Sequence, residues 1–227
     1  MVRKPCPHDA WAEVYDQQPN PLLALAERTL TPLLPDLRGR AVLDVACGTG
    51  RGLERMMALG AGTAVGVDRS AAMLARARSR LAGRARLVRA DVLRLPLAAH
   101  WAECILCCLA LAYLPDVPAL ARELSRQSRP GAYILIADVH PEAGWRRGFT
   151  SSDGHWTEVP HYPQPPRRLE AAFTAAGCQL LSCQQARLGE PERPIFAAAG
   201  RPDLFDAAGA VPALLTFVWR VSPPVQP

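Results

Sequence analysis

The stretch AVLDVACGTGR, residues 41–51, decides the fold of this chain. Its apolar residues predict a short buried strand that carries one acid, Asp44, and leads into the glycine turn GTG at residues 48–50. A helix is expected to begin near Gly52. Glycine suits such a turn because the backbone bends sharply and comes within contact distance of a ligand, where a Cβ would interfere. The free N–H groups at the start of the following helix would point at that ligand. The stretch is therefore typical of a nucleotide-binding turn.

The spacing of the glycines narrows the kind of nucleotide. A dinucleotide fingerprint G-x-G-x-x-G that begins at Gly48 needs a small residue at position 53, which is Leu53. The pattern acid-x-small-x-Gly-x-Gly is instead complete, with Asp44, Ala46, Gly48 and Gly50. On these residues, the run LDVACGTGR resembles the first motif of class I S-adenosylmethionine-dependent methyltransferases. It is most similar to the small-molecule branch of ubiquinone and menaquinone biosynthesis methyltransferases (methyltransferase type 11), many of which carry glycine in place of Ala46.

Composition limits the class of protein. The 227 residues are 49% apolar and 21% charged, which suits one domain, or one domain with a small cap, around a substantial core. No long uncharged apolar run predicts a membrane span, and no signal peptide is visible, so a cytoplasmic location is expected. The seven cysteines are odd in number and form no paired C-x-x-C units, so reduced thiols and no metal site are expected.

The positive charge does not by itself indicate nucleic-acid binding. The net charge of +5 is spread along the chain, mostly as arginine on predicted helical faces without interleaved aromatic residues, so a solvated surface is the preferred interpretation. The sequence ALAY at residues 110–113, after the fourth predicted strand, is not the N/D-P-P-Y/F motif of nucleic-acid methyltransferases. Nucleic acid is therefore an unlikely partner.

Acids follow the next two predicted strands. Strand 64–67 ends at Asp68, 20 residues beyond Gly48, where a carboxylate can accept hydrogen bonds from both ribose hydroxyls. Asp68 could instead cap the helix that begins there, a role that Ser70 could also fill. Strand 85–92 contains Asp91 near its end, which could alternatively be a turn residue before Leu-Pro. Successive strand ends with glycines or acids predict a ligand crevice along one edge of a parallel sheet.

The resemblance implies S-adenosylmethionine as cofactor and a role for each motif residue. Asp68 would bind the ribose, Asp91 the adenine amino group and the Val92 N–H the adenine ring, while Leu109 would lie beside the methionine part. The implied cofactor-binding residues are Asp44, Ala46, Gly48, Gly50, Asp68, Arg69, Met73, Asp91, Val92 and Leu109.

Residues 1–40 are expected to form an N-terminal helical cap, with helices over 9–17 and 21–37. Trp11 and Tyr15 lie four residues apart and would share one helical face, which either docks the helix or lines the pocket. In the family that the chain resembles, an aromatic residue of this segment often closes over cofactor and substrate. This resemblance favours Tyr15 as a pocket residue.

The rest of the chain completes an α/β fold. Residues 41–139 are expected to form the cofactor-binding half, with a fourth strand over 103–111 and a fifth over 132–139. Residues 140–227 would supply a lid, over 140–166, and two C-terminal strands, over 179–188 and 213–221. The expected architecture is a Rossmann-like, seven-stranded, mostly parallel sheet of order 3-2-1-4-5-7-6, with its last strand antiparallel and helices on both faces.

Methyl transfer from a sulfonium is an in-line displacement, so the main task is to hold the acceptor atom about 3 Å from the methyl group. A base is needed only where the acceptor must lose a proton. His140 is the preferred candidate, because it follows the fifth strand, and Tyr15 is the second. Arg146 and Arg147 could bind an acidic acceptor or be solvated. The expected acceptor pocket comprises Trp11, Tyr15, His155, Trp156, His161 and Tyr162, the aromatic members stacking on a planar acceptor.

The sequence therefore predicts a methyltransferase that acts on a small molecule beneath a lid. It does not distinguish O-, N-, S- and C-methylation, nor does it indicate an oligomeric state. Two alternatives stay open: a protein of the same fold that binds the cofactor without transferring a methyl group, and a nucleic-acid methyltransferase.

Overall fold

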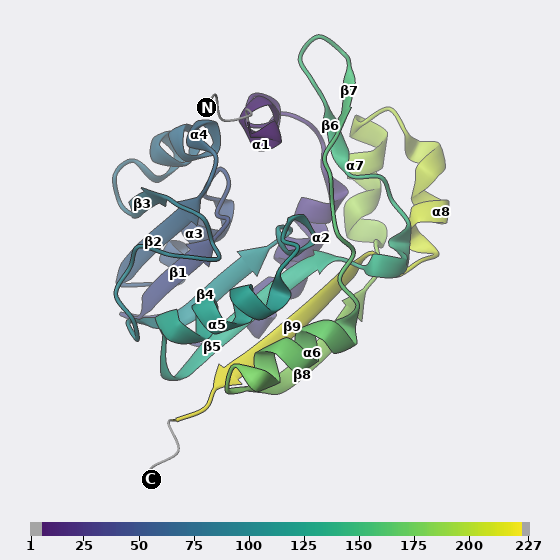
Figure 1. Cartoon of the computed structure of the whole chain (residues 1–227). Helices are drawn as coiled ribbons and strands as arrows, with labels where there is room; N and C mark the ends of the chain where they lie inside the picture. Colours follow the sequence, from purple (N-terminus) through teal and green to yellow (C-terminus); the bar gives the residue numbers. More distant parts are fainter. Residues whose placement is uncertain (1–5, 224–227) are drawn as a thin grey trace.

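The computed structural model describes residues 6–223, in which a twisted central sheet is covered by helices on both faces (Figure 1). The sheet has the strand order β3-β2-β1-β4-β5-β9-β8, and β9 is antiparallel to both of its neighbours. Since β8 and β9 are the sixth and seventh strands of this sheet along the chain, the predicted order 3-2-1-4-5-7-6 is confirmed. Its strands are β1 (Ala41–Val45), β2 (Thr63–Asp68), β3 (Arg86–Arg89), β4 (Ala102–Cys108), β5 (Ser128–Val139), β8 (Cys178–Ala186) and β9 (Leu214–Val221).

The central strands are apolar throughout because both of their faces are buried. Successive side chains of a strand point to opposite faces, so Leu43 and Val45 pack with one set of helices and Val42 packs with the other. One face is covered by α5 (Val117–Gln127) and α6 (Pro166–Ala175), and the opposite face by α2 (Pro21–Leu30), α3 (Arg51–Ala58) and α4 (Ala71–Leu81).

The N-terminal segment is less helical than expected. α1 (Pro7–Trp11) ends six residues before the predicted end at 17, and turns follow. The predicted helix over 21–37 is α2 followed by the 3₁₀ turn η1 (Thr31–Leu33), and Asn20 caps α2 by accepting hydrogen bonds from the N–H groups of Leu22 and Leu23. The segment 12–18 keeps local backbone hydrogen bonds, such as Gln18 N–H to the Val14 carbonyl at 3.1 Å, and its side chains make the long-range contacts described below.

Three strand boundaries also differ. β3 ends at Arg89, so Asp91 lies in the turn beyond it. β4 ends at Cys108 rather than 111, because Leu109 has φ 53°, which breaks an extended strand. β5 begins four residues earlier than expected, at Ser128, which pairs with Ala102.

Segments of the second half lie outside the main sheet. Within 140–166, β6 (Gly148–Thr150) and β7 (Trp156–Glu158) form a hairpin that was not predicted and that projects beyond the sheet (Figure 1). The segment before β9 contains α7 (Arg193–Ala198) and α8 (Phe205–Gly209). The remaining 3₁₀ turns are η2 (Leu111–Tyr113), η3 (Pro141–Ala143), η4 (Glu190–Glu192) and η5 (Pro202–Leu204). Over residues 6–223, every helix is too short or too polar to cross a membrane.

Candidate functional site

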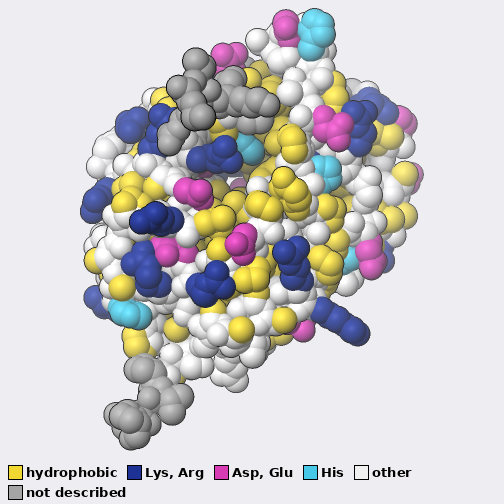
Figure 2. All heavy atoms as spheres, in the orientation of Figure 1, with side chains coloured by type: hydrophobic (Ala, Val, Ile, Leu, Met, Phe, Trp, Pro, Cys, Tyr) yellow, Lys and Arg dark blue, Asp and Glu magenta, His cyan; other side chains and the backbone are white. Residues whose placement is uncertain are grey.

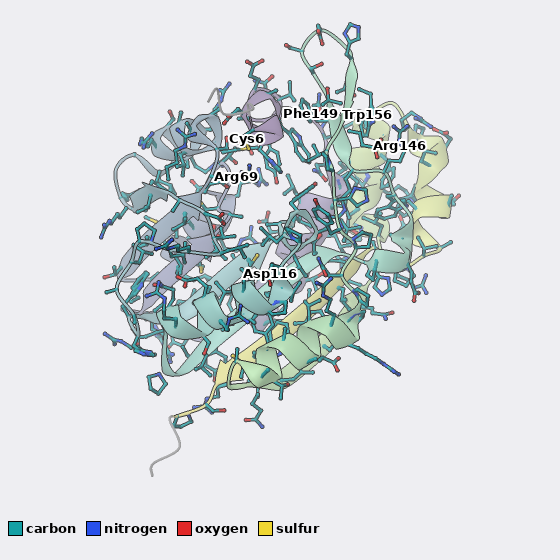
Figure 3. The ribbon with its side chains drawn as sticks, in the orientation of Figure 1. Cys6, Arg69, Asp116, Arg146, Phe149 and Trp156 are labelled. Carbon is teal, nitrogen blue, oxygen red and sulfur yellow. The ribbon has the colours of Figure 1, made fainter. Side chains whose placement is uncertain are left out.

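A cavity of about 300 Å³ lies at the carboxyl ends of the parallel strands. One wall carries eight of the ten predicted cofactor residues: Ala46, Gly48, Asp68, Arg69, Met73, Asp91, Val92 and Leu109. The other wall comprises His8, Trp11, Tyr15, Asn20, Leu22, Cys108, Ala110, Tyr113, Leu114, Val139, Trp145, Arg146, Arg147 and Gly148. Figure 3 shows Arg69 and Arg146 on opposite sides of this space, with Cys6 near α1 and Phe149 and Trp156 in the hairpin.

Asp68 ties the glycine turn to the end of β2. Its Oδ2 accepts a hydrogen bond from the N–H of Gly48 at 2.9 Å, and its Oδ1 accepts one from the N–H of Ser70 at 2.8 Å. The Ser70 hydroxyl caps α4 by accepting the N–H of Met73 at 3.1 Å. Ser70 is therefore the helix cap, and Asp68 is a buried carboxylate that lines the cavity.

The glycine turn leaves room for a ligand. Gly48 has φ +52°, and a Cβ added there would meet only the Met73 sulfur, at 4.0 Å, so the space above the turn is open on the cavity side. Gly50, with φ +83°, lies behind the turn, and its added Cβ would come within 3.1 Å of Leu81. Open space beside Gly48, the Asp68 carboxylate and the exposed Asp91 fit a nucleoside with ribose hydroxyls and an adenine amino group. These residues therefore fit the adenosine part of S-adenosylmethionine.

Asp44 does not face the main cavity. It is 3% exposed and lines a smaller neighbouring cavity of about 90 Å³. Burial, together with the charge of Asp68, raises the pKa of Asp44 to about 8, and a hydrogen bond from the Leu53 backbone opposes this rise. A Cβ on Gly52 would come within 2.8 Å of Asp44 Oδ2, which explains a glycine in the first turn of α3.

Carboxylates of the N-terminal segment hold it against the cofactor wall. Asp9 Oδ1 accepts a hydrogen bond from the Ser70 hydroxyl at 2.6 Å. Asp16 accepts one from the Thr49 hydroxyl at 3.1 Å and pairs with Arg80 at 2.8 Å. The segment therefore contacts both the glycine turn and α4 from the outside.

Aromatic side chains join the N-terminal segment to the hairpin. The Trp11 ring stacks on Phe149, with centroids 5.4 Å apart, and meets the edge of Tyr15 at 5.4 Å. Tyr15 is buried, which raises the pKa of its phenol and keeps it protonated at neutral pH. Trp11 and Tyr15 thus lie on the cavity wall opposite the cofactor residues.

A buried ion pair that sequence reasoning missed lies under the same wall. Arg147 pairs with Asp138 at 2.8 Å, and both side chains are at most 10% exposed. Asp138 Oδ2 also accepts the N–H of Ala112 at 2.7 Å, which fixes η2 and its Tyr113. The Arg147 guanidinium carbon lies 5.6 Å from the Tyr113 ring centroid. The sequence could have indicated Asp138 as a site residue, because it is an acid near the end of an apolar strand, as Asp44 is.

His8 was also missed, because nothing in its local sequence marks it. It lines the cavity, and its ring meets the edge of Tyr113 at 4.9 Å. Burial lowers the pKa of His8 below its usual value, so the imidazole is neutral at physiological pH.

Several predicted acceptor residues lie elsewhere. His140 follows β5 as expected, but it is 3% exposed and does not line the cavity. Its Nδ1 accepts the N–H of Glu142 at 3.2 Å, so it caps η3, while its buried Nε2 has no partner within residues 6–223. The structure therefore does not bring His140 to the reaction space.

The four acceptor residues that were predicted in the lid also stay outside the cavity. His155 and Trp156 are exposed, Tyr162 is 49% exposed, and His161 is partly buried, and none of the four lines the cavity. Trp156 lies against Arg146, whose guanidinium carbon is 5.8 Å from its ring centroid. The part of the predicted lid that does line the cavity is the short run 145–148, which ends on the first residue of β6.

This fold and this cavity define a Rossmann-like domain that binds a nucleoside cofactor. Residues 43–136 match the family model described as "Methyltransferase domain". Over this stretch the chain is similar to the methyltransferase domain family.

Two curated relatives and one solved structure illustrate the similarity. The chain is 36% identical over 157 residues to the malonyl-[acyl-carrier protein] O-methyltransferase of Halorhodospira halophila, covering 66% of this chain and 51% of the relative. It is 34% identical over 110 residues to the 2-phytyl-1,4-naphtoquinone methyltransferase of Synechococcus elongatus, covering 45% of this chain and 47% of that relative. An S-adenosylmethionine dependent methyltransferase from Mesorhizobium loti shares the fold, with a TM-score of 0.69, 23% identity, and coverage of 88% of this chain and 99% of that one. The chain spans about half the length of these curated relatives.

Proposed function

We propose that the chain transfers a methyl group from S-adenosylmethionine to a small-molecule acceptor. The observation that carries this proposal is one cavity with two unlike walls. One wall holds a buried carboxylate, a glycine turn and strand-end residues suited to a nucleoside. The other holds mostly aromatic and apolar side chains, together with His8, Asn20, Arg146 and Arg147. The bound cofactor would supply a methyl group on a positively charged sulfur.

On the cofactor wall, Asp68 would bind the ribose hydroxyls. Each of its oxygens already accepts one backbone N–H, and each keeps a further lone pair for a ligand hydroxyl. Asp91 and Val92 would hold the adenine, with Met73 and Arg69 beside it. Ala46 and Leu109, at the ends of β1 and β4, would flank the methionine part.

On the acceptor wall, Trp11, Tyr15, Tyr113 and Trp145 would exclude water and hold a planar acceptor. Two groups there could take part in proton transfer if the acceptor needs it. The neutral His8 imidazole can accept a proton, and the protonated Tyr15 phenol can donate a hydrogen bond. His140 is not retained, since it lies outside the cavity.

The relatives' names suggest which acceptors to test first. They give a malonyl group on an acyl-carrier protein and a phytyl naphthoquinone as acceptors of those enzymes.

We infer that residues 1–40 form a cap, of which 6–40 are described, that 41–139 form the cofactor half, and that 140–227 supply the lid and final strands. The free state of all seven cysteines supports a cytoplasmic location.

The test is transfer of a labelled methyl group from S-adenosylmethionine to a panel of phenols, hydroxyquinones, amines, thiols and malonyl thioesters. Labelled product from at least one acceptor, lost on Trp11→Ala, is expected. The exposed Trp156→Ala should keep the activity, because Trp156 does not line the cavity. Tight cofactor binding without transfer to any acceptor would favour the non-methylating alternative.

A further inference from the structure

The positive charge of the chain is concentrated in one segment. Residues 69–94 contain eight arginines and one acid, and therefore carry a net charge of +7. The other 18 basic and 20 acidic residues sum to −2. The segment runs from the start of α4 through β3 to the turn beyond it, so one region of the surface accounts for the whole positive balance.

The arginines of this segment differ from the others in their partners. Outside it, ten of the sixteen described arginines form ion pairs with a carboxylate. Inside it, Arg80 alone does so within the described part of the chain. The seven others are exposed: Arg69, Arg76, Arg78, Arg84, Arg86, Arg89 and Arg94.

These side chains form one surface. Figure 2 shows Lys and Arg side chains gathered on the side of the molecule formed by α4 and β3, left in this view. Arg89 Nε donates a hydrogen bond to the Arg69 carbonyl at 3.1 Å, which joins the β3 end of the segment to its start. Arg69 also lines the cavity, so the arginine surface, defined by these seven residues, reaches the cavity mouth.

The surface does not suit the cofactor itself. S-adenosylmethionine carries a sulfonium and an ammonium against one carboxylate, so a positive surface repels it. It does not suit a membrane either, because none of the large exposed apolar side chains of the described chain (Leu59, Trp156, Tyr162, Leu181, Leu204) falls within 69–94. No Phe, Tyr or Trp occurs in 69–94 to stack on bases.

We propose that the arginine surface docks the acidic face of a protein partner at the cavity mouth. The guanidinium group pairs with carboxylates in a bidentate manner, and unpaired guanidinium groups leave that capacity free. Elsewhere in this chain, carboxylates are the partners that most arginines already have. The seven arginines of this surface have no carboxylate partner within residues 6–223, so the surface fits a partner that brings carboxylates.

The experiment measures binding of the purified full chain to immobilised poly-L-glutamate at 150 mM NaCl. The test variant is Arg76→Glu/Arg78→Glu on α4. The matched control is Arg122→Glu/Arg167→Glu on α5 and α6, which changes the net charge equally at exposed helical arginines without an ion pair in the described chain. We expect the test variant to bind poly-L-glutamate at least fivefold more weakly than wild type, and the control variant less than twofold more weakly. Binding of the wild-type chain should weaken with added salt. Circular dichroism checks that both variants fold.

Equal losses for both variants would overturn the docking surface, because bulk charge would then explain the binding. So would no loss for either. A 20-base-pair DNA duplex, or vesicles of phosphatidylglycerol, that bound at least tenfold more tightly than poly-L-glutamate and lost binding with the same variant would assign the surface to nucleic acid or membrane instead. S-adenosylmethionine affinity is measured on the same samples, so failure of the proposed enzyme function would be seen separately.

Discussion

Asp44 is a buried acid whose protonation affects the stability of the domain. Its pKa is about 8 in the folded chain and near 3.8 when unfolded. Between these values the folded state holds a proton that the unfolded state has lost, so the free energy of unfolding falls as pH rises from about 4 to about 8. Asp44→Asn removes this dependence. Urea denaturation from pH 5 to 8.5 should show wild type losing about 4 kcal/mol relative to the variant.

Parallel stability curves for wild type and Asp44→Asn would contradict the raised pKa. Asp116→Asn is the control for the loss of a carboxylate, because Asp116 is exposed at the start of α5. It should show no such divergence with pH.

Ala82 is a second residue with a local cost. It ends α4 with φ 48°, a conformation that glycine adopts without strain, and its side chain is exposed. Ala82→Gly should therefore raise the free energy of unfolding by about 0.5–1 kcal/mol, after the greater flexibility of the unfolded chain is counted. Thermal unfolding checks it against Ala75→Gly, in the middle of the same helix, which should lower stability by about 1 kcal/mol. A lower free energy of unfolding in both variants would contradict backbone strain at Ala82.

At the scale of elements, the Asp138–Arg147 pair holds η2 against the end of β5. Arg147→Met leaves a buried carboxylate without its counter-ion and should cost about 3 kcal/mol of stability. Arg147→Met/Asp138→Asn leaves no charge and should recover most of that loss. Arg146→Met, which removes an exposed arginine paired with Glu158, should change stability by less than about 0.5 kcal/mol. Chemical denaturation of the three variants and wild type would contradict this account if the double variant were the least stable.

The elements that could be predicted from sequence are those with a strong local pattern. β1, β4 and β5 are apolar runs in the sequence. The acids at residues 44, 68 and 91 lie near the ends of predicted strands, so the sequence alone indicates them. The hairpin has only three residues in each strand, too few for a periodic signal. The helix expected over 9–17 ends at Trp11, and the turns beyond it place Asp16 in contact with Thr49 and Arg80, which no local pattern reveals. The Arg147 pairing and the place of His8 depend on tertiary contacts in the same way.

At the scale of the whole molecule, the sheet order brings residues from distant parts of the chain to one edge. The cofactor wall could be predicted because each of its motifs follows a strand and parallel strands end together. The acceptor wall could be predicted only at Trp11 and Tyr15, since it combines the N-terminal segment, η2 and residues 145–148. His155, His161, Trp156 and Tyr162 were placed there by residue type alone, and His140 was chosen because it follows β5. None of the five lines the cavity.

The central claim is that this cavity binds S-adenosylmethionine, and calorimetric titration of the purified chain tests it most directly. We predict micromolar binding of S-adenosylmethionine and S-adenosylhomocysteine and none of NADH. Asp68→Ala should weaken binding at least tenfold, from lost hydrogen bonds to a charged group worth about 1.5–3 kcal/mol, and the exposed Asp116→Ala should not. Absence of binding to both cofactor forms, or equal binding of NADH, would contradict the account.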